Sequence, residues 1–186
     1  MSHRVEARVT GEIVALDAII AERNERATVL SVACFLEDRL RDMHRQRGGL
    51  VVRPRKQCPE LQCPMRNTKP PRNRPPSFHE LIVYARANRL LTHDVLHDIN
   101  RIAEIRNLFA HSFAVRTFAN SPRAADICDQ LRLPDMPGEQ PPESIWVRAR
   151  HRFDIAARVT TRALVDVIFQ NEHDDREEQR AAGLYP

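Results

Sequence analysis

The sequence predicts an all-α protein, a helical bundle of about four to five helices that carries a flexible Arg/Pro-rich insertion. Aromatic residues make up only 5% of the 186 residues, and glycine occurs five times. An all-β fold uses both kinds of residue heavily, in turns and on pleated faces. Apolar residues instead recur every three or four positions along several stretches, which is the period of an amphipathic helix.

The first two helices are expected over residues 1–20 and 22–44. Gly48 and Gly49 follow the second stretch, where a helix end is expected. The predicted buried stripes are Val9, Ile13, Leu16, Ile19 and Ile20 in the first helix, and Ala27, Leu30, Ala33, Cys34, Leu36 and Leu40 in the second.

A basic, proline-rich insertion over residues 45–77 is predicted to interrupt the domain as a flexible loop. Seven prolines fall between residues 54 and 76, and the segment 45–76 holds nine basic residues and one acid. Too little apolar surface is available there to offset the entropy of ordering the chain. The segment is either a solvated linker or a site that binds nucleic-acid phosphates. In the second case, its affinity for nucleic acid falls as the salt concentration rises. The phosphate contacts in that second case are Arg53, Arg55, Lys56, Arg72 and Arg74.

Two further helices are expected after the insertion. Ser77 followed by Glu80 forms the pattern of a capping box, which marks the start of a helix. Thr92 or Asp94 caps the next helix, whose apolar face is the broadest in the chain. That face is formed by Val95, Leu96, Ile99, Ile102, Ala103, Ile105 and Phe109.

A second proline-rich loop, at about residues 133–142, precedes the last predicted helix. This helix is expected to run from about Glu143 to Asn171, and a charged tail follows over residues 172–186. Residues 1–171 are therefore interpreted as one helical domain. No apolar run approaches the ~18 residues that span a bilayer, and charges interrupt the N-terminus at once. These observations predict a soluble, cytoplasmic protein without a membrane segment.

The most specific signal is the run from Arg106 to Ser112, Arg-Asn-Leu-Phe-Ala-His-Ser, at the end of the apolar helix. Asn107 and His111 share a helix face, whereas Arg106 lies about 140° around the helix from His111. One interpretation is structural, a helix end stabilised by a cationic or hydrogen-bonded histidine. The other is functional, an arginine that grips a phosphate beside a histidine that titrates near neutrality.

This run resembles the motif of the HEPN superfamily, helical bundles in which an Arg is followed after four to six residues by a His. Here four residues separate Arg106 from His111, and Asn107 takes the polar position after the Arg. Many HEPN proteins are metal-independent endoribonucleases in which two subunits bring the motif together. The resemblance thus implies a homodimer, and as one alternative a catalytic set of Arg106, Asn107 and His111 acting on RNA without a cofactor.

The chain also resembles the mannitol operon repressor (MltR) family over roughly residues 20–133. The likeness rests on Glu25 to Glu37, Phe78 to Leu91 and Asp98 to Ser112, followed by Phe118 and Ile127-Cys128. It implies an all-helical, transcription-related regulator. Since no DNA-reading motif is identifiable, we expect no sequence-specific DNA binding. A regulatory protein partner or RNA is expected instead, with a non-catalytic HEPN-type binding module as a further alternative.

Two weaker patterns raise the question of a metal site. Cys58 and Cys63 form a single C-x4-C pair, whereas zinc sites usually combine two pairs or a tighter Cys/His set. His93 and His97 are spaced i, i+4, but no third ligand is obvious. We therefore expect no metal and no cofactor, and we interpret the cysteines as reduced thiols.

Overall fold

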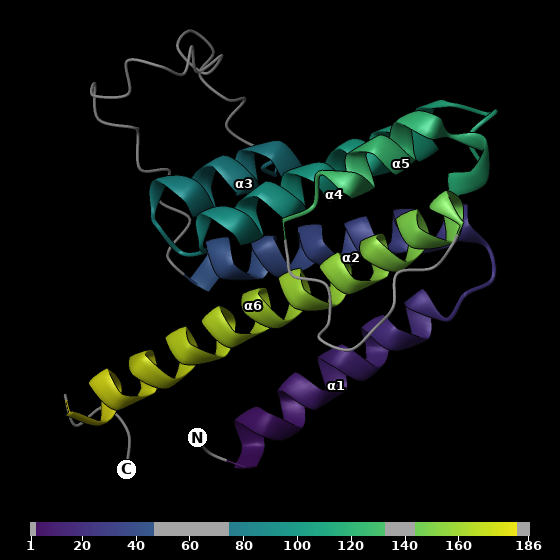
Figure 1. The fold of residues 1–186 in the computed structure, drawn as a ribbon. Coiled ribbons are helices and arrows are strands. Elements are labelled where there is room, and N and C mark those ends of the chain that lie inside the picture. The colour runs from purple at the N-terminus through teal and green to yellow at the C-terminus, as the bar shows by residue number, and fades with distance from the viewer. Residues whose placement is uncertain (1–2, 47–74, 133–143, 182–186) are drawn as a thin grey trace, which may run out of the picture.

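The computed structural model describes residues 3–46, 75–132 and 144–181, and Figure 1 shows that they form a bundle of helices. Within these ranges there is no strand, and the all-α prediction is confirmed. The helices are α1 (His3–Ile20), α2 (Glu25–Gln46), α3 (Phe78–Ala87), α4 (His93–His111), the short 3-10 helix η2 (Phe118–Asn120), α5 (Pro122–Asp129) and α6 (Ile145–Ala181).

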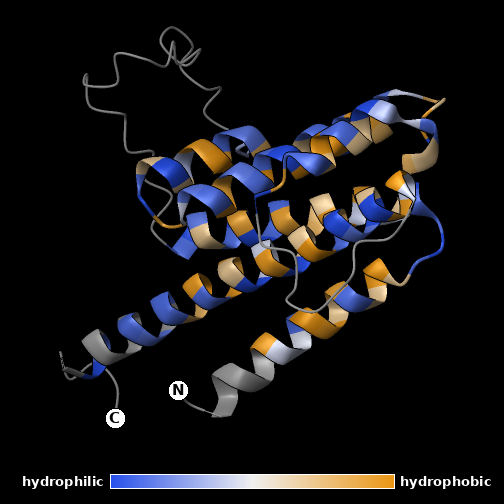
Figure 2. Ribbon diagram, viewed as in Figure 1, coloured by the Kyte–Doolittle hydropathy of each residue, from blue (hydrophilic) through white to orange (hydrophobic). Residues whose placement is uncertain are grey.

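Helices α2, α4 and α6 form the centre of the bundle, since each packs against the other two. Helix α1 packs against α6 and α2 on one side (Figure 1), while α3 packs against α2 and α4 on the other. Helix α5 and η2 pack on α6 near the end of α4. Figure 2 shows hydrophobic and hydrophilic residues alternating along each helix, as amphipathic helices require.

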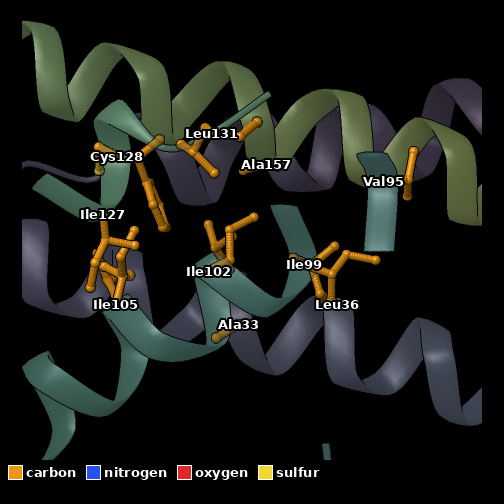
Figure 3. Close-up of a cluster of buried hydrophobic side chains, with 14 of the residues drawn as sticks. Ala33, Leu36, Val95, Ile99, Ile102, Ile105, Ile127, Cys128, Leu131 and Ala157 are labelled. Atoms are coloured by element: carbon orange, nitrogen blue, oxygen red, sulfur yellow. The ribbon is translucent and has the colours of Figure 1, made fainter. Parts of the chain in front are cut away.

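The core is built mainly from aliphatic side chains of α4 and α2. Ile99, Ile102 and Ile105 of α4 are fully buried, and Figure 3 shows them beside Leu36 of α2 and residues of α5 and α6. The broad apolar face predicted for this helix therefore forms the middle of the domain. Its position fixes where the motif at the end of α4 emerges.

The two predicted helix starts are formed as expected. The Glu80 N–H donates to Ser77 Oγ at 3.4 Å, and the Ser77 N–H donates to Glu80 Oε2 at 2.6 Å, which completes the capping box. Of the two candidates for the start of α4, Thr92 is the cap, because its Oγ1 accepts from the Val95 N–H at 3.4 Å. Asp94 lies inside the first turn instead.

Three details of the structure differ from the sequence-based expectations. Helix α5 had not been predicted, and it brings the described total to six α-helices. Helix α6 continues to Ala181, ten residues beyond the predicted end at Asn171. Cys34 was placed on the buried stripe of the second helix but is exposed, whereas Val29, Val32 and Met43 complete that stripe.

The basic insertion and the second proline-rich loop fall largely outside the described residues. So do Arg53, Arg55, Lys56, Arg72 and Arg74, and the Cys58 and Cys63 pair. In the ranges that are described, no helix is both long and apolar enough to cross a membrane.

Candidate functional site

The motif occupies the last two turns of α4, and its members divide between the core and the surface. Phe109 is fully buried, with its ring centroid 5.2 Å from that of Phe118, which lies 5.6 Å from the ring of Phe153 in α6. Asn107 and His111 are exposed, and Arg106 is half-buried. The phenylalanine of the motif therefore anchors the helix end, while its polar residues face outward.

Arg106 and Asn107 form a direct contact. Arg106 Nη1 donates to Asn107 Oδ1 at 3.0 Å. Helix α4 is continuous to His111, so no break turns Arg106 onto the face that His111 occupies. The structure thus brings Arg106 to Asn107 and leaves His111 one turn further along the helix.

His111 lies in the last turn of α4, where a cationic side chain interacts favourably with the helix dipole. Its imidazole makes no hydrogen bond to any residue that the structure describes. Within the described residues, the histidine is thus not hydrogen-bonded, and its role as a cation at the helix end stays an interpretation. Both ring nitrogens are without a partner in that part of the chain.

The segment that follows α4 is held by the first residues of α2. The Phe118 N–H donates to Glu25 Oε2 at 2.6 Å. Arg26 donates from Nη2 to the Ala110 carbonyl at 3.4 Å and from Nη1 to the Ser112 carbonyl at 3.5 Å. Because these carbonyls lie at the end of α4, Arg26 also satisfies backbone acceptors that the helix leaves open.

Phe113 is the most exposed large apolar side chain among the described residues, at 87%. The guanidinium carbon of Arg26 lies 5.7 Å from the centroid of its ring, within the range of a cation–π contact. The ring therefore contacts a residue of α2, while most of its surface is exposed to solvent. We call Arg26, Arg106, Asn107, His111 and Phe113 the α4-end surface.

Asn120 fixes the loop that carries this surface. Its Oδ1 accepts from the N–H groups of Arg116 and Thr117, each at 3.1 Å, and its Nδ2 donates to the Ala114 carbonyl at 2.8 Å. Ser121 then caps α5 by accepting from the Ala124 N–H at 3.2 Å. The loop is thus ordered by its own side chains, so the α4-end surface is preorganised.

None of the five residues of the α4-end surface lines the cavity that lies beside Arg39 and Arg45 of α2. At 1.5 Å per residue, that part of α2 is about 20–30 Å from Arg26. The α4-end surface can therefore bind a partner, whereas an enclosed reaction site needs further groups from another chain.

The two histidines near the start of α4 each contact a neighbouring side chain. His97 Nδ1 lies 2.9 Å from Asp98 Oδ1, and His93 Nδ1 lies 3.0 Å from Arg132 Nη1. Within the described ranges, no three His, Cys, Asp or Glu side chains come together as a metal would require. Cys128 is buried, and burial, followed by the nearby Asp129 charge, raises the pKa of its thiol far above the ordinary value.

Sequence reasoning missed the contribution of α2 to this surface. Helical periodicity leaves Glu25 and Arg26 off the apolar stripe of their helix, but both contact the end of α4 or the segment after it. Helical periodicity reports only whether a residue faces the core. The contact joins residues 84 to 93 positions apart in the chain, and no local pattern encodes it.

Comparison with known proteins gives no family assignment. Neither the family models, nor the curated proteins, nor the solved structures contain a match to this chain.

Proposed function

We propose that this chain is a helical regulatory protein, related to the MltR and HEPN-like bundles, that acts by binding another macromolecule through the α4-end surface. The observation that carries the proposal is the position of Phe113, which is 87% exposed and lies against Arg26 beside the polar end of α4. The regulatory and transcription-related role is an extension of the family resemblance, and the surface supplies its physical basis.

The composition of the surface favours binding. Aromatic residues and arginine are enriched among the residues that contribute most to protein interfaces. Phe113 offers an apolar anchor, Arg26 lies against its ring, and Arg106 and His111 add hydrogen-bond donors at the end of α4. Because Glu25 and Asn120 already order the segment, little conformational entropy is lost when a partner binds.

A single copy of the surface favours binding over catalysis. A general base needs an orienting partner and a defined place for the substrate. His111 has no hydrogen-bond partner in the described chain, and it does not line the cavity beside Arg39 and Arg45. We therefore propose that the α4-end surface binds a regulatory protein partner, and the family resemblance extends this proposal to a dimer.

Site-specific photo-crosslinking in the native cell tests this proposal. In one variant, p-benzoylphenylalanine replaces Phe113. In the matched control, it replaces Val14 of α1, which is 61% exposed. We expect a discrete crosslinked protein at position 113 that is absent at position 14 and is reduced by Arg26→Ala. Equal products at both positions, or none at 113, contradict a partner at this surface.

A metal-independent endoribonuclease is the second candidate, favoured by the contact of Arg106 Nη1 with Asn107 Oδ1 at 3.0 Å one turn from His111. In a dimer paired around this helix end, His111 accepts the proton of an RNA 2′-hydroxyl as its oxygen attacks the adjacent phosphorus. Arg106 stabilises the charge on the phosphate oxygens, and Asn107 orients Arg106. The P–O bond to the 5′-oxygen breaks, and this oxygen takes a proton from water, so that a 2′,3′-cyclic phosphate and a 5′-hydroxyl are formed.

End-labelled RNA of mixed sequence, incubated with the purified protein in excess chelator, tests this candidate. Cleavage that leaves 2′,3′-cyclic phosphate ends and disappears in His111→Ala establishes the nuclease. His93→Ala is the control, since that histidine lies at the other end of α4. No cleavage by a folded dimer leaves the binding function as the proposal.

A further inference from the structure

A cavity of about 290 Å³ lies between α1, α2 and α6, away from the α4-end surface. Its volume is close to the lower end of the range for small-molecule sites. The α6 side is apolar, formed by Val165, Ile168 and Phe169, all of them buried. Ile168 belongs to the main core, whereas Val165 and Phe169 pack with Val9 in a separate small cluster. The cavity lies where these two clusters meet.

The other side of the cavity carries charges of alternating sign. Arg39 Nη1 lies 3.0 Å from Glu12 Oε1 and 3.4 Å from Asp42 Oδ2, and Arg45 Nη1 lies 3.3 Å from Asp42 Oδ1. The order around the cavity is therefore Glu12, Arg39, Asp42, Arg45, and the four charges cancel. A ligand with a single charge meets a neighbour of like charge wherever it binds in this row.

Arg39 is held in a fixed position beside the cavity. Its Nε is buried and has no acceptor among the described residues. Its guanidinium is held in place by the two carboxylates and by Phe35, whose ring centroid lies 5.4 Å from the guanidinium carbon. The guanidinium therefore presents a fixed positive charge at the edge of the cavity.

We propose that this cavity binds a small zwitterion with an apolar side chain, that is, an apolar α-amino acid. Such a ligand carries its ammonium and carboxylate on one carbon, so the two charges can pair with adjacent members of the alternating row. The carboxylate accepts from Arg39 and Arg45, and the ammonium donates to Asp42 or Glu12. The side chain packs on Val165, Ile168 and Phe169.

Calorimetric titration of the full chain with L-leucine, L-isoleucine and L-phenylalanine tests this assignment. The matched probes are 4-methylpentanoate, which lacks the ammonium of leucine, and isopentylamine, which lacks the carboxylate. We expect saturable binding of at least one amino acid, at least about tenfold tighter than that of the two leucine analogues. Absence of binding with a Kd below about 1 mM for all three amino acids overturns the proposal.

Variants of Arg45 and Asp42, two charged residues that line the cavity, test whether the ligand binds there. Arg45→Ala is expected to weaken amino-acid binding about tenfold, and its side chain is 70% exposed, so folding is not at risk. Asp42→Asn is expected to remove the preference for the amino acid over 4-methylpentanoate. Arg41→Ala is the control, because Arg41 pairs with Glu37 and Asp38 and does not line the cavity. Binding that survives both Arg45→Ala and Asp42→Asn, or equal affinity for the analogues, also overturns the assignment.

Discussion

The two ends of α4 carry similar residues but use them differently. Near the start, Asp98 is fully buried and accepts from the Arg132 N–H at 3.0 Å and contacts His97 Nδ1 at 2.9 Å. Near the end, Asn107 and His111 have the same i, i+4 spacing as His93 and His97, and His111 has no hydrogen-bond partner among the described residues. The start of α4 therefore buries a carboxylate that has partners within the chain, whereas the end of α4 carries an exposed imidazole without one.

The difference arises from what packs beside each end. The chain leaving α5 returns to the first half of α4, where Arg132 contacts Asp98 through its backbone and Asp94 through its guanidinium. At the other end, the loop after His111 turns toward α2, and Phe118 rather than a polar group covers the core. Residue type and spacing therefore do not decide whether a polar pair stabilises the fold or remains available for binding.

The largest expected loss of stability distinguishes Phe109 from Phe113, the two phenylalanines nearest the C-terminal end of α4. Phe109→Ala removes a buried ring that contacts Phe118, and we expect a loss of about 3–5 kcal/mol in the free energy of unfolding. Phe113→Ala, at an 87% exposed position, is expected to change it by no more than about 0.5 kcal/mol. Urea unfolding followed by circular dichroism measures both. Similar losses in the two variants contradict the division between core and surface.

The second prediction concerns the start of α4, where Asp98 is buried. Asp98→Ala leaves the Arg132 N–H without its buried acceptor, so we expect a loss of about 2–3 kcal/mol in the free energy of unfolding. Asp98→Asn keeps one carbonyl acceptor and should lose less. Urea unfolding of both variants measures which one loses more stability. An Asp98→Ala variant as stable as the parent shows that the buried carboxylate does not stabilise the segment after α5.

The sequence was most informative about the faces and the starts of the helices. The apolar faces of α2 and α4 and the capping box at Ser77 were predictable, because periodicity and caps are local properties. Helix α5 was not recognised because it is short and begins directly after a 3-10 turn at Phe118. The position of the motif was predictable, whereas the contacts of Arg26 depend on long-range packing.

The third prediction compares the two caps of α4. Thr92→Ala removes the side-chain oxygen that accepts from the Val95 N–H, and we expect a loss of about 1 kcal/mol in the free energy of unfolding. Ser112 at the other end acts through its backbone N–H, which donates to the Leu108 carbonyl at 3.2 Å. Ser112→Ala should therefore leave stability nearly unchanged. Thermal unfolding midpoints distinguish them, and a larger shift for Ser112→Ala runs against this assignment of the caps.

The smallest expected effect on stability belongs to the residue with the strongest functional claim. His111→Ala removes an exposed imidazole without a hydrogen bond in the described chain, so the free energy of unfolding should change by no more than about 0.5 kcal/mol. The same variant should weaken partner capture at position 113, since His111 supplies one of the outward donors. Stability and crosslinking yield are measured on one preparation. A destabilisation above about 1 kcal/mol assigns His111 to the helix end, whereas unchanged stability with lost capture assigns it to the partner.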